Sequence, residues 1–181
     1  MARINLVEAY IAKKVAMGNQ ELSFARETMA KDEYHAFVMN KNIEEFDEEL
    51  LNKAKAVIIN RFGLRSRPRL FRTPTLRQWV AEVLNAYSRE DILNFFSERS
   101  GFAAEKIAGE TIDSNLLYGN FVSDLVDELE FATGKQLCDS NDMDHPLWYL
   151  YEDITYGDIA DFFSENGSKR VEENKELAGV C

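Results

Sequence analysis

The chain has 181 residues, of which 45% are hydrophobic and 12% aromatic, a composition that excludes intrinsic disorder as the overall state and allows one core or two small ones. No apolar run approaches the roughly 20 residues of a membrane-spanning helix, and Glu8 interrupts what would be the apolar region of a signal peptide. Because two cysteines in such a chain do not make a disulfide framework, we expect a cytoplasmic protein without a membrane segment.

The net charge of −11 is unevenly distributed along the chain. From Lys53 to Arg89 there are nine basic residues and one acidic residue, Glu82, which gives a balance of +8. From Gly101 to Cys181 there are five basic and 18 acidic residues, which gives −13. Such asymmetry predicts either a binding surface or two parts of the chain that complement each other.

Helical periodicity dominates the N-terminal half. The spacing predicts a first helix that ends near Gly18, a second, less regular helix over residues 22–38, and a long amphipathic helix over residues 43–62 that ends at Gly63. The apolar positions of the first and third helices are Ile4, Val7, Tyr10, Ile11 and Val15, and Ile43, Phe46, Leu50, Ala54, Val57, Ile58 and Phe62.

A basic connector follows, with the sequence Arg65-Ser-Arg-Pro-Arg-Leu-Phe-Arg-Thr-Pro74. Its two prolines exclude a regular helix throughout. Because proline is favoured at the first helical position, Thr73 and Pro74 predict the start of the next helix. The predicted buried face of that helix comprises Leu76, Trp79, Val80, Val83, Leu84 and Tyr87.

The C-terminal half begins with a capping-box pattern, Ser88-Arg-Glu-Asp91, which predicts another helix start. Further helices are predicted over residues 103–107, over residues 116–133 and after a second such pattern, Thr155-Tyr-Gly-Asp158. The helices that begin Thr-Leu-Arg-Gln-Trp-Val and Thr-Tyr-Gly-Asp-Ile-Ala start similarly, but the rest of the two halves does not align. We therefore expect an all-α helical bundle with two small subdomains, residues 1–87 and 88–167, and a polar tail, residues 168–181.

Two fragments of the second subdomain, Val122-Ser-Asp-Leu-Val-Asp-Glu-Leu-Glu-Phe-Ala-Thr-Gly134 and Ile154-Thr-Tyr-Gly-Asp-Ile-Ala-Asp-Phe-Phe163, resemble the second and last helices of acyl carrier proteins. The resemblance implies a helical domain whose partners bind an acidic second helix and whose serine at the start of that helix carries phosphopantetheine. That serine is missing, because the matching position in Tyr118-Gly-Asn120 is Gly119, which has no hydroxyl group.

Ser114, five residues upstream of Gly119, is the nearest alternative attachment site. A serine ahead of Leu116 and Leu117 is also a preferred helix N-cap, a role that needs no prosthetic group. We therefore expect no cofactor, and a true acyl carrier that bears phosphopantetheine on Ser114 is the alternative hypothesis.

The predicted helix over residues 116–133 carries a run of carboxylates, three of which lie three and four residues apart and so point the same way. Such a run is either a solvated face or a docking surface for Arg and Lys, and the many other acidic residues of this half favour docking. The segment Pro146-Leu-Trp-Tyr-Leu-Tyr151 is unusually aromatic for a loop and is a candidate anchor for a partner. The predicted partner-binding residues are Asp124, Asp127, Glu128, Glu130, Trp148 and Tyr149.

No metal site or enzymatic activity is predicted. An EF-hand loop that starts at Asp139 would need Gly and Glu where the chain has Asp144 and Leu150. A site built on Cys138 and His145 would need two further ligands from elsewhere. The sequence also contains neither a Gly-rich phosphate loop nor a Gly-x-Ser-x-Gly motif.

Taken together, these patterns indicate a non-enzymatic protein–protein interaction module, of adaptor, immunity or inhibitor type, that docks its acidic half on a basic protein surface. Nucleic-acid binding through Arg61–Arg77, with Phe62 and Phe71 among the arginines, is a further alternative. The net charge of −11 opposes that alternative.

Overall fold

The computed structural model describes residues 2–112, 121–137 and 154–164. These ranges contain nine α-helices, one short 3₁₀ helix and no β-strand, which confirms the predicted all-α class. None of the helices in these ranges is both long and apolar enough to cross a lipid bilayer. The chain divides into two compact units, unit 1 over Met1–Ala86 and unit 2 over Tyr87–Cys181.

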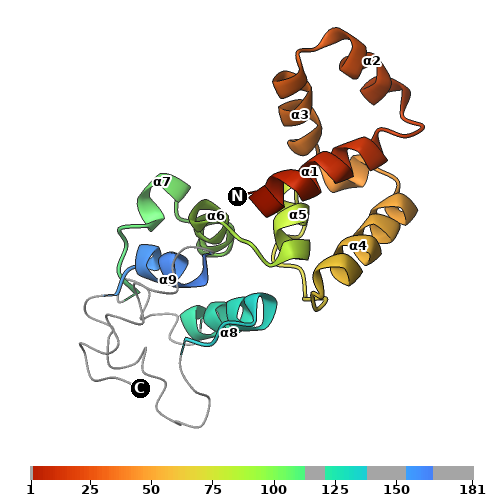
Figure 1. The fold of residues 1–181 in the computed structure, drawn as a ribbon. Helices are drawn as coiled ribbons and strands as arrows, with labels where there is room; N and C mark the ends of the chain where they lie inside the picture. Colours follow the sequence, from red (N-terminus) through yellow and green to blue (C-terminus); the bar gives the residue numbers. More distant parts are fainter. Residues whose placement is uncertain (1, 113–120, 138–153, 165–181) are drawn as a thin grey trace. The chain divides into compact units, whose positions relative to one another are not determined.

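Unit 1 is built around its first helix (Figure 1). Helix α1 packs against α3, α4 and α5, and together they bury a core that includes Ile11, Leu22, Met39, Leu76 and Val80, all with no exposed surface. The elements are α1 (Ala2–Val15), α2 (Gln20–Thr28), α3 (Lys31–Met39), a 3₁₀ helix (Ile43–Glu45), α4 (Glu48–Phe62) and α5 (Leu76–Leu84).

The predicted helix over residues 22–38 is wrong in extent, because the chain forms two helices there. The backbone is extended at Met29 and Ala30, which ends α2 and starts α3. Glu33 favours this restart, since its Oε2 accepts a hydrogen bond from the N–H of Ala30 at 3.4 Å. The extended residues between the two helices do not interrupt the spacing of the apolar residues, so the sequence pattern does not reveal the break.

The predicted helix over residues 43–62 is also too long. Its first residues form the 3₁₀ helix, and α4 begins only after Asp47, whose Oδ1 accepts a hydrogen bond from the N–H of Leu50 at 2.9 Å. The later start rotates the buried face, so Leu51 is in the core whereas Val57, predicted to face it, is 49% exposed. The predicted end is confirmed, because Gly63 closes α4 in the left-handed conformation with φ of 62°.

Helix α5 starts later than the predicted Thr73 and Pro74. Its N-cap is Thr75, whose Oγ1 accepts from the N–H of Gln78 at 3.3 Å, while Gln78 Oε1 accepts from the N–H of Thr75 at 3.0 Å. This reciprocal pair satisfies two backbone donors at the start of the helix. The predicted buried face is confirmed for Leu76, Trp79, Val80, Val83 and Leu84, whereas Tyr87, which is also buried, lies beyond the end of the helix.

An isolated β-bridge between Asn42 and Thr75 holds the start of α5. The N–H of Ile43 donates to the carbonyl of Pro74 at 3.1 Å, and the N–H of Leu76 donates to the carbonyl of Lys41 at 2.8 Å. Pro74 therefore serves as an acceptor in the bridge and not as the first residue of the helix.

The core of unit 2 is aromatic, and Figure 1 shows the helices that surround it. Helix α6 packs against α7 and α9, and α8 packs against α9. The ring of Phe96 lies 5.5 Å from that of Phe95 and 5.0 Å from that of Tyr156, both in tilted or edge-on arrangements that aromatic pairs prefer. The elements are α6 (Arg89–Ser100), α7 (Ala104–Ile107), α8 (Phe121–Thr133) and α9 (Tyr156–Phe163).

Both predicted capping boxes of unit 2 are confirmed. In α6, Ser88 Oγ accepts from the N–H of Asp91 at 3.1 Å, and Asp91 Oδ2 accepts from the N–H of Ser88 at 2.8 Å. In α9, Thr155 and Asp158 make the same pair of bonds at 3.2 and 2.9 Å. Four residues therefore define the starts of two helices.

A second isolated β-bridge joins Thr111 to Thr155. The N–H of Ile112 donates to the carbonyl of Ile154, and the N–H of Tyr156 donates to the carbonyl of Glu110, both at 3.1 Å. This bridge holds the start of α9 against the segment that follows α7.

Candidate partner-binding surfaces

Helix α8 buries an apolar face and exposes an acidic one. The exposed side carries Asp124, Asp127 and Glu128, which the sequence predicts to point the same way. Asp124 and Asp127 form no salt bridge with any residue that the structure describes. The buried side chains of the helix are Leu125, Val126, Leu129 and Ala132.

Glu128 is tied to α6. The Nη2 of Arg99 donates to Glu128 Oε1 at 3.0 Å, and the Arg99 side chain is only 17% exposed. The guanidinium of Arg99 also lies 4.4 Å from the centroid of the Phe95 ring, a cation–π contact. Part of the charge of Glu128 is therefore neutralised within unit 2, so Asp124 and Asp127 are the more available carboxylates.

Glu130 supports the backbone beyond α8. Its Oε1 accepts a hydrogen bond from the N–H of Leu137 at 2.8 Å, and the Glu130 side chain is half-buried. Since Leu137 is itself buried, this bond satisfies a backbone donor that water cannot reach easily. Glu130 thus has a structural role in the described part of the chain, as Glu128 does through its bond to Arg99.

Phe131 is the residue of this surface that the sequence analysis missed. Its side chain is 70% exposed, although aromatic side chains of this size are usually largely buried. It lies four residues after Asp127 and seven after Asp124, so the three side chains share one stripe of α8. The helical spacing gave the signal, because Phe131 falls outside the buried positions Leu125, Leu129 and Ala132.

Three other predicted site residues lie outside the described ranges. Ser114, the alternative phosphopantetheine site, belongs to residues 113–120, and Trp148 and Tyr149 belong to residues 138–153. The proposed loop ligands Cys138 and His145 lie there as well.

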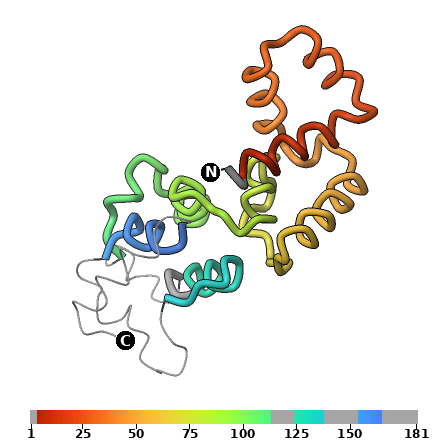
Figure 2. The backbone as a smooth tube through the Cα atoms, viewed as in Figure 1, coloured from red at the N-terminus to blue at the C-terminus, as the bar shows by residue number. Residues whose placement is uncertain are grey.

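Unit 1 carries a second charged segment, the basic connector between α4 and α5, whose backbone path is traced in Figure 2. We call Arg65, Arg67, Arg69 and Arg72 the connector arginines. Arg65, Arg69 and Arg72 are exposed and Arg67 is half-buried, and none of the four forms a salt bridge within the described ranges. The aromatic residue among them, Phe71, is 3% exposed and therefore offers no platform for stacked bases.

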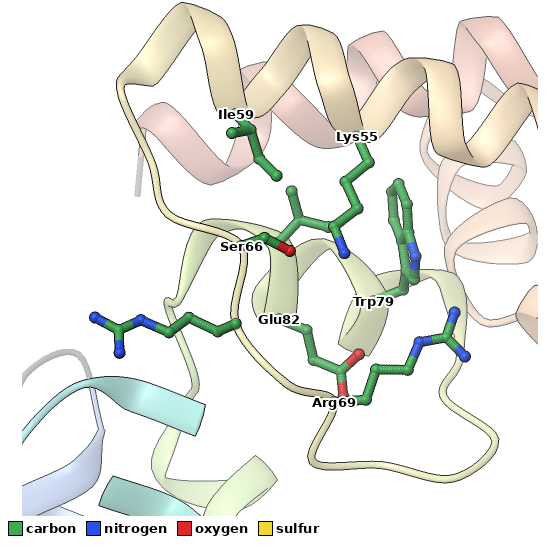
Figure 3. Close-up of a pocket in the computed structure, with 8 residues that line it drawn as sticks. Lys55, Ile59, Ser66, Arg69, Trp79 and Glu82 are labelled. Carbon is green, nitrogen blue, oxygen red and sulfur yellow. The ribbon is translucent and has the colours of Figure 1, made fainter. Parts of the chain in front are cut away.

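Glu82 of α5 holds this connector in place (Figure 3). Its Oε1 accepts hydrogen bonds from the N–H groups of Leu70 and Phe71 at 3.0 and 2.9 Å. Its other oxygen, Oε2, is buried and accepts no hydrogen bond from any described residue. Lys55, Arg69 and Trp79 stand around this carboxylate and line a cavity of about 10 Å³, the size of one water molecule.

Burial raises the pKa of Glu82 to about 6, although the two N–H donors and the positive charges of Arg69 and Lys55 act in the opposite direction. Loss of hydration therefore outweighs the favourable contacts of the carboxylate. In the sequence, Glu82 is visible only as an isolated acidic residue in a basic stretch, which does not by itself indicate burial.

No group of His, Cys, Asp and Glu residues within the described ranges could hold a metal ion. Comparison with protein-family models, curated proteins and solved structures finds no match to this chain.

Proposed function

We propose that this protein is a protein–protein interaction module that binds a basic partner surface with the exposed stripe of α8. The observation that carries the proposal is the 70% exposed ring of Phe131 on the same stripe as Asp124 and Asp127, two exposed carboxylates that form no salt bridge with a described residue. An exposed aromatic ring beside charged groups is the composition of binding hot spots, where the ring supplies buried area and the rim supplies specificity.

The charge of the surrounding chain supports a basic partner. Unit 2 contains 21 acidic and seven basic residues, a net charge of −14. A field of this sign accelerates the approach of a positively charged surface and repels acidic competitors. The resemblance to acyl carrier proteins points to the same helix, because partners of that family grip their acidic second helix.

The test compares retention of partners by wild type and by the charge-reversed variant Asp124→Arg/Asp127→Arg. Glu128 is left unchanged because its bond to Arg99 contributes to packing. The full chain is immobilised, exposed to lysate, and the retained proteins are identified and then assayed in purified form. We expect a basic protein whose Kd weakens at least tenfold with the variant and also with Phe131→Ala.

A matched control carries the same change of charge elsewhere in unit 2, Glu90→Arg/Glu105→Arg, since both residues are exposed. It should retain the partner at wild-type affinity. Equal binding by wild type and by the Asp124→Arg/Asp127→Arg variant, with both proteins folded by circular dichroism, would overturn the assignment of the surface.

A further inference from the structure

The connector arginines are a basic surface of the kind that the α8 stripe is proposed to bind. We propose that the partner of the α8 stripe is the connector of a second copy of this chain, so that the protein self-associates. This inference rests on the proposed function of α8 and names its partner. It uses two surfaces that are each exposed and without salt bridges to the described residues, Asp124 and Asp127 on one and Arg65, Arg69 and Arg72 on the other.

The connector presents its arginines from a fixed backbone. The carboxylate of Glu82 holds the N–H groups of Leu70 and Phe71, and the bridge between Asn42 and Thr75 holds the end of the segment. Because the backbone is already ordered, a partner that binds these side chains loses less conformational entropy than it would with a flexible arginine-rich loop.

The two surfaces match in chemistry. Arginine suits carboxylates because its planar donors can bind both oxygens at once. The guanidinium plane also stacks on aromatic rings, so the same arginines can cover the exposed ring of Phe131.

A nucleic acid fits the connector less well. Single-stranded binding sites use exposed aromatic rings as stacking platforms, whereas Phe71 and Trp79 beside the connector are 3% and 4% exposed. Unit 1 as a whole has 14 basic and 11 acidic residues, a net charge of only +3, in a chain of −11.

Each copy carries −11, so two copies repel each other at long range. Within about 10 Å, the screening length at 0.1 M salt, the local pairing of opposite charges dominates. We therefore expect weak association that depends on concentration, with a Kd between about 1 μM and 1 mM.

Sedimentation equilibrium over that concentration range tests the inference on the full chain. The weight-average mass of wild type should rise above the 20.8 kDa of one chain. Two variants should each remain monomeric, Asp124→Arg/Asp127→Arg and Arg65→Glu/Arg72→Glu, the second chosen because neither residue lines the Glu82 cavity. An equimolar mixture of the two variants should associate again, since each supplies the wild-type surface that the other lacks.

The matched control for unit 1 is Arg26→Glu/Lys31→Glu, which reverses two exposed charges on α2 and α3 and should associate like wild type.

Monomeric wild type, association that persists in either variant, or a mixture that stays monomeric would each overturn the inference. Monomeric wild type that binds duplex DNA through Arg65 and Arg72 would overturn it in favour of a nucleic-acid surface. If a different basic protein loses binding with Asp124→Arg/Asp127→Arg but not with Arg65→Glu/Arg72→Glu, the function of α8 stands and self-association does not.

Discussion

Each of the two units contains an isolated β-bridge at the start of its last helix, but the two units carry opposite net charges. In each unit an isolated bridge pairs the segment before a long helix with the N-cap threonine of the last helix, Asn42 with Thr75 in unit 1 and Thr111 with Thr155 in unit 2. The next residue along, Ile43 or Ile112, donates its N–H to the carbonyl just ahead of that threonine in both units. The same bridge therefore occurs in two units whose net charges are opposite in sign.

The side chains that secure the bridge-and-helix arrangement differ in sign. In unit 1 the buried carboxylate of Glu82 binds backbone N–H groups of the connector. In unit 2 the ammonium group of Lys135 binds backbone carbonyls at the end of α9, including that of Ser164 at 2.6 Å. Both side chains provide hydrogen bonds to polar backbone groups that lie beside a core. The anion accepts from N–H groups, and the cation donates to carbonyls.

The largest expected effect concerns the residue two positions after the N-cap threonine. In unit 1 this residue is the exposed Arg77, whereas in unit 2 it is the buried Gly157. A Cβ atom at Gly157 would lie 2.7 Å from the carbonyl oxygen of Ala108, a backbone atom that cannot move alone. We expect Gly157→Ala to lower the free energy of unfolding by about 3 kcal/mol, as overpacked sites do.

Urea denaturation of the full chain measures this change, and hydrogen exchange assigns it to unit 2. The matched control is Gly109→Ala, where the nearest atom to a new Cβ lies 3.9 Å away. We expect the control to stay within about 0.5 kcal/mol of wild type, the usual range for surface changes. Equal stability of the two variants would contradict the close packing of α9 on the turn after α7.

The sequence predicted the local parts of this comparison and missed the tertiary ones. The capping pairs Ser88 with Asp91 and Thr155 with Asp158 were readable because the interacting residues lie three positions apart. The bridge between Thr111 and Thr155 joins residues that are distant in the chain. The periodicity of a single sequence describes spacing within one segment and cannot predict such pairs. The start of α4 was mispredicted for a related reason, since the apolar spacing runs on through the 3₁₀ turn at Ile43.

The candidate site also has local features that the sequence predicted and tertiary features that it did not. The shared direction of Asp124 and Asp127 followed from helical spacing, and both are exposed. The bond between Arg99 and Glu128 depends on how α6 meets α8, so it could not be read from either helix alone. The exposure of Phe131 could have been predicted from the same spacing, because this residue falls outside the buried positions of α8.

Unit 1 contains two buried carboxylates, Glu8 and Glu82, and the described residues of unit 2 contain none, so we expect the two units to respond differently to pH. The pKa of Glu82 is raised from 4.5 to about 6 in the folded chain, so the folded state binds a proton more tightly than the unfolded state does. The penalty of the buried charge is therefore full above pH 6 and is relieved as the pH falls toward 4.5. By thermodynamic linkage, this shift in pKa raises the free energy of unfolding by about 2 kcal/mol at the lower pH.

Glu82→Gln should remove this pH dependence, because a neutral amide oxygen can still accept from Leu70 and Phe71 without a charge to desolvate. We expect the variant to match or exceed the stability of wild type at pH 7 and to gain less on acidification. Urea titrations across this pH range measure the difference, with the exposed Glu48→Gln as the control for a lost carboxylate. Parallel pH profiles for wild type and Glu82→Gln would show that the carboxylate is hydrated in the folded chain.

The smallest expected effect lies at the end of α9. The Nζ of Lys135 donates to the carbonyls of Phe162 and Phe163 at 3.3 Å and to that of Ser164 at 2.6 Å, which satisfies acceptors and places a positive charge at the negative end of the helix. Lys135→Met keeps most of the side-chain volume but removes the donor, and we expect a loss of about 1 kcal/mol. Amide exchange in the last turn of α9 should accelerate about fivefold, whereas the exposed Lys106→Met should leave it unchanged. Unchanged exchange in Lys135→Met would mean that water satisfies these carbonyls equally well. The parallel with Glu82 would then fail, because only unit 1 would depend on a charged side chain to hold its backbone.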